Sequence, residues 1–263
     1  MIVFAAFTPH SPLLVPSIGK EARSRLKQTI VAMKSLADDL YASKPDTIVM
    51  ISGHAIRHET VFSANLHDEY RVDLRDFGDL SIDREFRPNL SLLDAIQRAV
   101  RRSGIPFTLD SDSRLDYGSA VPLMILTESI PSISIIPISY GGLDPKEHLA
   151  FGRVLKETLS ARHERIAVLA SGDLAHCLSS DAPAGFRPEG AIFDETVRQS
   201  LASSSVATLL SLDQNIVEHA SECAYRPLLI LIGILERIRT RPEILSYESP
   251  FGVGLLVARF HLS

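Results

Sequence analysis

The chain alternates short apolar runs with longer segments in which apolar residues recur every three or four positions. Five runs rich in Ile, Val and Ala have the length and composition of buried β-strands. They are Ile2 to Phe7, Thr47 to Ser52, Ser132 to Ser139, Ile166 to Ser171 and Val253 to Phe260. Because most of these runs are apolar at successive positions, we expect helices to cover both faces of the sheet that they form.

Several of the longer segments have the apolar stripe of an amphipathic helix. The stripe is clearest in Glu21 to Ala42, and similar stripes occur in Leu92 to Val100 and in Leu149 to Leu159. Tyr225 to Ile238 is apolar nearly all round, which predicts a deeply buried helix. The alternation of strands and helices predicts an α/β fold, with three α/β/α layers around a central, mainly parallel but mixed sheet.

The segment from Phe62 to Leu90 does not follow this pattern, because it combines short alternating pieces with several Asp and Arg residues. We expect it to form an excursion beside the sheet, either a hairpin or a lid. No stretch is rich enough in Pro, Gly, Ser or like charge to read as a linker. We therefore expect residues 1–263 to form a single domain.

Composition and charge exclude several classes of function. A net charge of -5 gives no basic surface for a phosphate backbone, so we expect no nucleic-acid partner. The apolar run Leu228 to Leu235 is too short to span a bilayer, and Met1 to Phe7 lacks the basic leader of a signal peptide, so we expect no membrane association. Two cysteines, Cys177 and Cys223, cannot form a disulfide framework, which favours a reduced, cytoplasmic protein.

The candidate chemistry lies just after the predicted strands. His10 follows the first strand, His54 follows the second, and Asp173 and His176 follow the strand that ends at Ser171. Because α/β sheets bind their ligands at the carboxyl ends of strands, we expect these side chains to meet. Neutral imidazoles are common ligands of transition metals. The sequence therefore predicts a metal site.

A third ligand is expected directly before the most apolar helix. Glu222 lies there, where a buried carboxylate requires a cation. Two imidazoles and one carboxylate on one side of an ion leave its other side free for substrate and dioxygen, as in non-haem Fe(II) oxygenases. No Gly-rich phosphate loop or Gly-x-Ser-x-Gly elbow is present, so nucleotide-binding and serine-hydrolase functions lose their main support.

Five short motifs together resemble the class III extradiol ring-cleavage dioxygenases, the LigB-like superfamily, and the resemblance spans nearly the whole chain. In order, they are Thr8-Pro-His-Ser-Pro12, Ser52-Gly-His-Ala55, Asp116-Tyr-Gly-Ser-Ala-Val-Pro-Leu123, Ser171-Gly-Asp-Leu-Ala-His176 and Ser221-Glu-Cys223. The resemblance implies one Fe(II) held by His10, His54 and Glu222, and His176 as the acid/base residue. It implies O₂ and a catechol- or aminophenol-like aromatic as substrates.

Two further residues are candidates for catalytic roles. Asp173 lies three residues before His176 and is expected to orient its imidazole or to cap the following segment. Tyr117 stands where many members of the family carry a histidine. Since an unperturbed tyrosine has a pKa of about 10, it is a poor proton shuttle at neutral pH, but it is able to donate a hydrogen bond to bound oxygen.

Two alternatives remain open at this point. In the Memo-type branch of the superfamily a cysteine occupies the comparable ligand position, so Cys223 in place of Glu222 would favour copper or zinc and a metal-binding protein without ring cleavage. We prefer Glu222, because oxygen ligation suits Fe(II) and matches the dioxygenase pattern. The other alternative is a zinc-dependent hydrolase with His176 as its base, although no zincin motif is present. Because some relatives work with a small companion chain, three arrangements stay open: the chain acts alone, as a homo-oligomer or with a small companion subunit.

Overall fold

A computed structural model describes residues 1–263 and has eleven strands in a mixed sheet. The strand order is β10-β11-β1-β9-β2-β8-β5-β4-β7, and β3 joins β8 and β6 off this path. The strands are β1 Ile2–Thr8, β2 Thr47–Ser52, β3 Phe62–Asn65, β4 Tyr70–Val72, β5 Glu85–Pro88, β6 Phe107–Asp110, β7 Arg114–Leu115, β8 Ser134–Ser139, β9 Ile166–Ser171, β10 Thr240–Glu248 and β11 Leu255–Leu262. The central strands β1, β9, β2 and β8 are parallel, and β11 pairs with β1 in the antiparallel sense.

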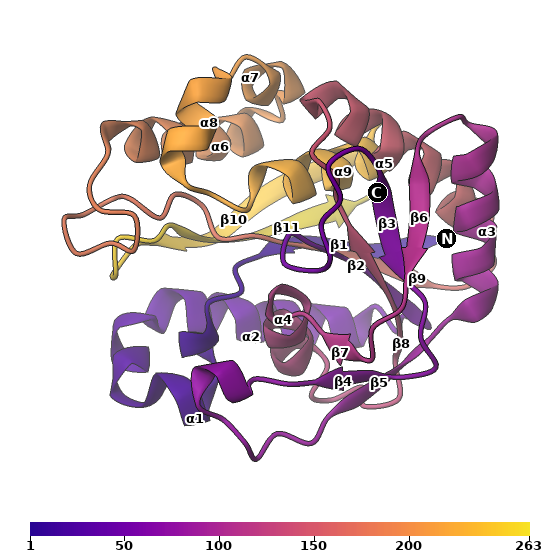
Figure 1. The fold of residues 1–263 in the computed structure, drawn as a ribbon, viewed down its shortest axis with the longest axis horizontal. Helices are drawn as coiled ribbons and strands as arrows, with labels where there is room; N and C mark the ends of the chain where they lie inside the picture. Colours follow the sequence, from indigo (N-terminus) through magenta and orange to yellow (C-terminus); the bar gives the residue numbers. More distant parts are fainter.

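Helices cover both faces of the sheet, as Figure 1 shows, with α1, α2 and α4 on one side and α5 to α9 on the other. Their bounds are α1 Pro16–Gly19, α2 Lys27–Ala42, α3 Leu90–Arg102, α4 Tyr117–Leu126, α5 Pro145–Ser160, α6 Pro188–Ser203, α7 Val206–Leu210, α8 Gln214–Ala220 and α9 Tyr225–Leu235. Successive side chains of β2 enter two separate cores: Val49 and Ile51 pack with α5 and α9, while Ile48 and Met50 pack with α2 and α4. The predicted three-layer α/β/α fold with a mixed sheet is confirmed.

All five predicted strands are present, although β8 and β11 each begin two residues later than expected. The sequence pattern missed β10, because this strand at the edge of the sheet contains polar residues and a proline, Pro242. It also missed α4, which has Pro122 inside it. The segment from Phe62 to Leu90 contains the antiparallel pair β4 and β5, so the expected hairpin is present and extends the sheet.

Close backbone packing fixes the position of the buried helix α9. Gly152 of α5 faces this helix, and an added Cβ at Gly152 would lie 2.3 Å from the carbonyl oxygen of Ile230. Only glycine allows this approach of the two helices. Because α9 begins directly after Cys223 and Ala224, its packing also fixes the segment that leads into it.

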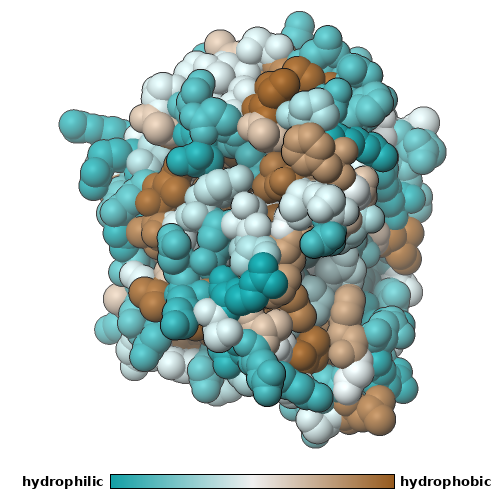
Figure 2. Space-filling view, turned by 90° about the vertical axis from the view of Figure 1, so that its left-hand side faces the viewer, coloured by the Kyte–Doolittle hydropathy of each residue, from teal (hydrophilic) through white to brown (hydrophobic).

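The outer surface is of mixed character. The face in Figure 2 carries mostly hydrophilic residues, with several separate hydrophobic patches between them. No helix combines the length and the apolar character needed to cross a membrane.

Candidate metal centre

Three side chains from distant parts of the chain converge at the carboxyl edge of the central strands. His10, His54 and Cys223 each offer one ligand atom, and these atoms all lie within 4.8 Å of one another. The two imidazole rings meet edge to face, with 4.6 Å between their centroids. His10 follows β1, His54 follows β2, and Cys223 precedes α9, so parallel strand ends and one helix start build the group.

His10 is the most firmly held member of the group. Its Nδ1 lies 2.8 Å from Ser171 Oγ, and its backbone N–H donates to Asp173 Oδ1 over 2.9 Å. The other ring nitrogen, Nε2, faces Cys223 Sγ at 3.3 Å. Burial lowers the pKa of His10 to about 3, and the nearby His176 contributes to the shift. The imidazole is therefore neutral at pH 7, as a metal ligand must be.

His54 lies in a more open position beside Tyr117. The Tyr117 hydroxyl is 3.0 Å from His54 Nε2, and the two rings are 4.3 Å apart between centroids. Ser52 Oγ accepts from the His54 backbone N–H and donates to Asp116 Oδ1, and the same carboxylate caps α4. Burial lowers the pKa of His54 to about 4, so this imidazole is also neutral at pH 7. Tyr117 thus contacts a metal-ligand candidate directly, and burial raises the pKa of its phenol.

Cys223 contacts the loop after β9 through both its backbone and its sulfur. Its N–H donates to the carbonyl of Asp173 over 3.2 Å, and its Sγ accepts from the Asp173 N–H at 3.3 Å. Burial raises the pKa of the thiol well above its ordinary value. A coordinating metal ion deprotonates a thiol outright, so a cation at this position would turn Cys223 into a thiolate.

Glu222 does not join the group of three. Its Oε2 accepts hydrogen bonds from the backbone N–H groups of Ala224 and Tyr225, at 2.5 and 2.6 Å. These amides lie at the start of α9, where backbone donors have no partner within the helix and a negative charge is stabilised. Burial raises the pKa of Glu222 to about 7. The geometry favours Cys223 over Glu222 as the third donor. Glu222 lies three residues before Tyr225, a spacing typical of a helix cap and a signal available in the sequence.

His176 and Asp173 lie beside the group but do not contact each other through a hydrogen bond. His176 donates from Nδ1 to the carbonyl oxygen of Ser221, which leaves its Nε2 free to accept a proton. Asp173 has one oxygen on the His10 backbone and the other 3.8 Å from His10 Nε2. In this structure Asp173 therefore orients His10, whereas the backbone of Ser221 orients His176.

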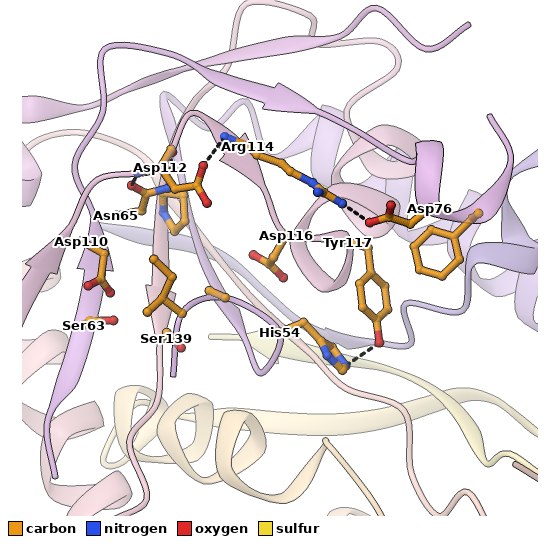
Figure 3. A pocket seen from close by; sticks show the side chains of 14 residues that line it. His54, Ser63, Asn65, Asp76, Asp110, Asp112, Arg114, Asp116, Tyr117 and Ser139 are labelled. Carbon is orange, nitrogen blue, oxygen red and sulfur yellow. Dashed lines mark hydrogen bonds and ion pairs between the residues drawn. The ribbon is translucent and has the colours of Figure 1, made fainter. Parts of the chain in front are cut away.

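A cavity of about 430 Å³ opens on the side of His54 and Tyr117. Figure 3 shows these two side chains at one end and Asp110 and Ser63 at the other. The walls come from the loop after β2, from β3 and β8, and from the segment between β6 and α4. This cavity was not predicted from the sequence, because it depends on the pairing of short strands distant along the chain.

A match to a protein family covers nearly the whole chain and indicates the general class of enzyme. The family described as the catalytic LigB subunit of aromatic ring-opening dioxygenase matches residues 4–258. The chain belongs to this family. The resemblance noted in the sequence is thereby confirmed, and the family supports a dioxygenase-like enzyme that uses a metal.

Individual relatives are distant. A protein of Clostridium acetobutylicum is 29% identical over 255 residues, covering 94% of this chain and 54% of its own length. The chain thus spans about half the length of that relative. The 2-aminophenol 1,6-dioxygenase alpha subunit of a Pseudomonas species is 25% identical over 276 residues, covering 99% of both chains. An uncharacterised protein of Escherichia coli K12 has the same fold, with a TM-score of 0.66, 20% identity, and coverage of 98% of this chain and 99% of its own.

Proposed function

We propose that this chain is a metal-dependent dioxygenase that opens an aromatic ring bearing two adjacent oxygen or nitrogen donors, such as a catechol or an aminophenol. The observation that carries the proposal is the convergence of His10, His54 and Cys223 beside an open cavity. Family membership and the Pseudomonas relative, whose name describes an aminophenol dioxygenase, support the reaction class.

The residues fit a transition metal rather than a hard ion such as Mg²⁺ or Ca²⁺. Two neutral imidazoles suit iron, zinc and copper, and a thiol is a ligand that hard ions rarely take. We propose Fe(II) as the working metal, with His10 and His54 as ligands and Cys223 as third donor in preference to Glu222. When bound, such a metal would hold O₂ and the two substrate donors in one complex.

The surrounding residues have roles that follow from their contacts. Ser171 and Asp173 hold His10 so that Nε2 faces Cys223. His176, with Nδ1 fixed on the Ser221 carbonyl, is proposed to accept a substrate proton at Nε2 and to return it later. Tyr117 holds its hydroxyl beside His54 and is proposed to donate a hydrogen bond to oxygen.

Oxygen uptake tests this proposal directly. Protein reconstituted with Fe(II) under anaerobic conditions is expected to consume O₂ with a catechol or with 2-aminophenol and to form a coloured ring-opened product. The His176→Ala variant is expected to bind the metal normally but to lose turnover. If no member of a broad catechol and aminophenol panel supports O₂ uptake, while the metal is bound stoichiometrically, ring cleavage is the wrong activity.

A second candidate is favoured by the presence of Cys223 rather than Glu222 in the group. It is a Memo-type protein that holds copper or zinc without ring cleavage, because soft thiolate ligation favours these metals. Tight retention of copper or zinc by the protein as purified, lost in Cys223→Ser but kept in Glu222→Gln, together with no O₂ uptake, would select it.

Association with another chain remains a further prediction. The Pseudomonas relative is named as an alpha subunit, so it works as part of an assembly. We propose that this chain also associates, with a companion subunit or with itself, and light scattering of the purified protein measures the latter.

A further inference from the structure

A row of aromatic rings leads from the metal group to the protein surface. The His54 ring lies 4.6 Å from the His10 ring and 4.3 Å from the Tyr117 ring, measured between centroids. The Tyr117 ring in turn meets the Phe77 ring edge to face, with 5.0 Å between centroids. Phe77 ends the row, is 36% exposed, and lines the cavity together with His54 and Tyr117. The proposed reaction gives Phe77 no role.

Phe77 lies on a short turn that is anchored on both sides. The turn is the 3-10 helix Arg75–Phe77. Before it, Leu74 is buried, and its carbonyl oxygen accepts from the Phe77 N–H over 2.9 Å. After it, the buried carboxylate of Asp79 accepts a hydrogen bond from the Ser17 hydroxyl, which belongs to a distant segment. The backbone on both sides of Phe77 is therefore fixed, although the ring itself is exposed.

Arg114 of β7 connects the same turn to the wall of the cavity. It forms ion pairs with Asp76 inside the turn and with Asp73 before it, and Figure 3 shows the first of these contacts beside Tyr117. A phenylalanine side chain normally gains free energy when it is buried. Because buried residues and Arg114 hold the turn, the exposed position of Phe77 is built into the fold. An exposed ring that a fixed backbone holds at a cavity indicates contact with an apolar ligand.

A second exposed apolar side chain lines the same cavity. Ile56 belongs to the loop after β2, two residues from His54, and is 47% exposed. Most other residues of the wall are polar, so Ile56, Phe77 and the Tyr117 ring are its largest apolar groups. The volume of about 430 Å³ is in the range of small-molecule sites. An aromatic ring is the ligand that fits this set, because aromatic rings pack against one another edge to face or offset.

We propose that Phe77 contacts the ring of the aromatic substrate and, with Ile56, determines which ring substituents are accepted. The two donors of the ring face the metal group, and an edge without donors lies against Phe77. An apolar substituent on that edge gains from burial there, whereas a carboxylate would lose its hydration without a partner. Alkyl-substituted catechols and aminophenols are therefore preferred over aromatic acids. This inference rests on the proposed function, since that function places the ring of the substrate at the metal group.

Binding without turnover tests this contact separately from the reaction. Zn(II) has no redox chemistry, so calorimetry on the full chain loaded with Zn(II) measures binding alone. The probes are catechol, 4-methylcatechol and 3,4-dihydroxybenzoate. The methyl group is expected to strengthen binding about threefold and the carboxylate to weaken it. Equal affinities for the three probes, a preference for the acid, or no binding of any of them would overturn the proposal.

Substitutions of the two apolar residues locate the contact. Phe77→Ala is expected to weaken catechol binding about fivefold and to abolish the preference for 4-methylcatechol, whereas Phe77→Leu keeps that preference because an apolar side chain remains. Ile56→Ala is expected to weaken binding about twofold. The matched control is Leu80→Ala, which removes an 81% exposed side chain just after the same turn and outside the cavity. An unchanged methyl preference in Phe77→Ala, or the same loss in Leu80→Ala, would contradict the assignment.

Oxygen uptake by the Fe(II)-loaded protein then separates the two proposals. In Phe77→Ala the KM for 4-methylcatechol is expected to rise about tenfold while kcat falls by less than about twofold, because Phe77 binds the ring and takes no part in the reaction. Binding that depends on Phe77, without O₂ uptake from any catechol, would support the contact and refute the ring-opening function. O₂ uptake with the same KM in the wild type and in Phe77→Ala, together with equal binding of the probes, would support the function and refute the contact.

Discussion

The two sides of the metal group differ in how they are held. On one side, His10 and Cys223 are 1% and 8% exposed, and both bond to the loop after β9. On the other side, His54 is half-buried and its ring contacts the Tyr117 hydroxyl at the edge of the cavity. One side is therefore buried and tightly hydrogen-bonded, whereas the other opens to the cavity; under the proposed function, the first holds metal ligands and the second admits a substrate.

This difference follows from the elements on each side. The buried side joins three segments, the ends of β1 and β9 and the start of α9, through backbone hydrogen bonds that solvent does not reach. The open side depends on the loop after β2, where Ile56 and Arg57 are exposed. Substitutions on the buried side should therefore affect metal binding and folding, whereas those on the open side should affect substrate selection.

The largest effect is expected from removal of the buried imidazole. His10→Ala should lower metal affinity by more than about 100-fold, because it removes a ligand. Competition with a chelator measures this affinity, and His163→Ala, an exposed histidine far along the chain, is the control. Metal affinity in His10→Ala equal to that of the control would mean that the ion lies elsewhere.

The next largest effect is expected from substitution of two glycines, Gly172 on the buried side of the metal group and Gly118 on the open side. A Cβ at Gly172 would lie 2.4 Å from Ala224 Cα and 2.8 Å from the Cys223 carbonyl, which are backbone atoms. A Cβ at Gly118 would instead meet the side chains of Ser52 and His54, at 2.5 and 3.0 Å.

Gly172→Ala should therefore destabilise the fold by about 1–3 kcal/mol, and Gly118→Ala by less, because side chains move more easily than backbone. Urea unfolding of both variants measures the difference. A larger loss of stability in Gly118→Ala would reverse the ranking of the two sides.

A smaller effect depends on pH and concerns the support of the loop after β9. Asp194 accepts from the Ala175 N–H at 2.8 Å and from the Tyr247 hydroxyl at 2.7 Å, and burial raises its pKa to about 6. Since its ordinary value is 3.8, the folded protein binds a proton there more tightly than the unfolded chain.

This contribution to stability is present below about pH 4 and is lost as the pH rises through about 6. Relative to Asp194→Asn, the wild type should thus lose about 2 kcal/mol of unfolding free energy as the pH rises from 4 to 7. Urea unfolding at pH 4 and pH 7 measures both proteins, and a difference that stays constant with pH would show that Asp194 ionises freely in the folded state.

The smallest effect is expected from removal of the Tyr117 hydroxyl, which lies on the open side of the metal group. Tyr117→Phe keeps the ring beside His54 and removes one hydrogen bond, so metal affinity should fall by no more than about threefold. The same chelator competition measures it. A loss as large as that of His10→Ala would make Tyr117 part of the metal-binding side.

Much of the fold was predictable because it depends on local patterns. Runs of apolar residues predict the buried strands, and apolar residues every three or four positions predict α2. The positions of His10 and His54 just after strand ends indicated that the two side chains would meet. Those predictions needed only the rule that parallel strands end at a common edge.

Other features depend on contacts that no local pattern encodes. Glu222 and Cys223 are neighbours in the sequence, and the free amides at the start of α9 bind the carboxylate, while the thiol faces His10. The walls of the cavity that come from β3 and β8 require these two strands to pair, which brings Ser63 opposite Ser139 across a long stretch of chain. In both cases contacts between distant segments decide the arrangement, and the local sequence is compatible with more than one.

X-ray absorption spectroscopy of the metal-loaded protein tests the central claim most directly. If His10, His54 and Cys223 hold one ion, the spectrum will contain two imidazoles and one sulfur at about 2.3 Å, and Cys223→Ser will remove the sulfur. A first shell made only of nitrogen and oxygen in the wild type, with an oxygen lost in Glu222→Gln, would contradict this account.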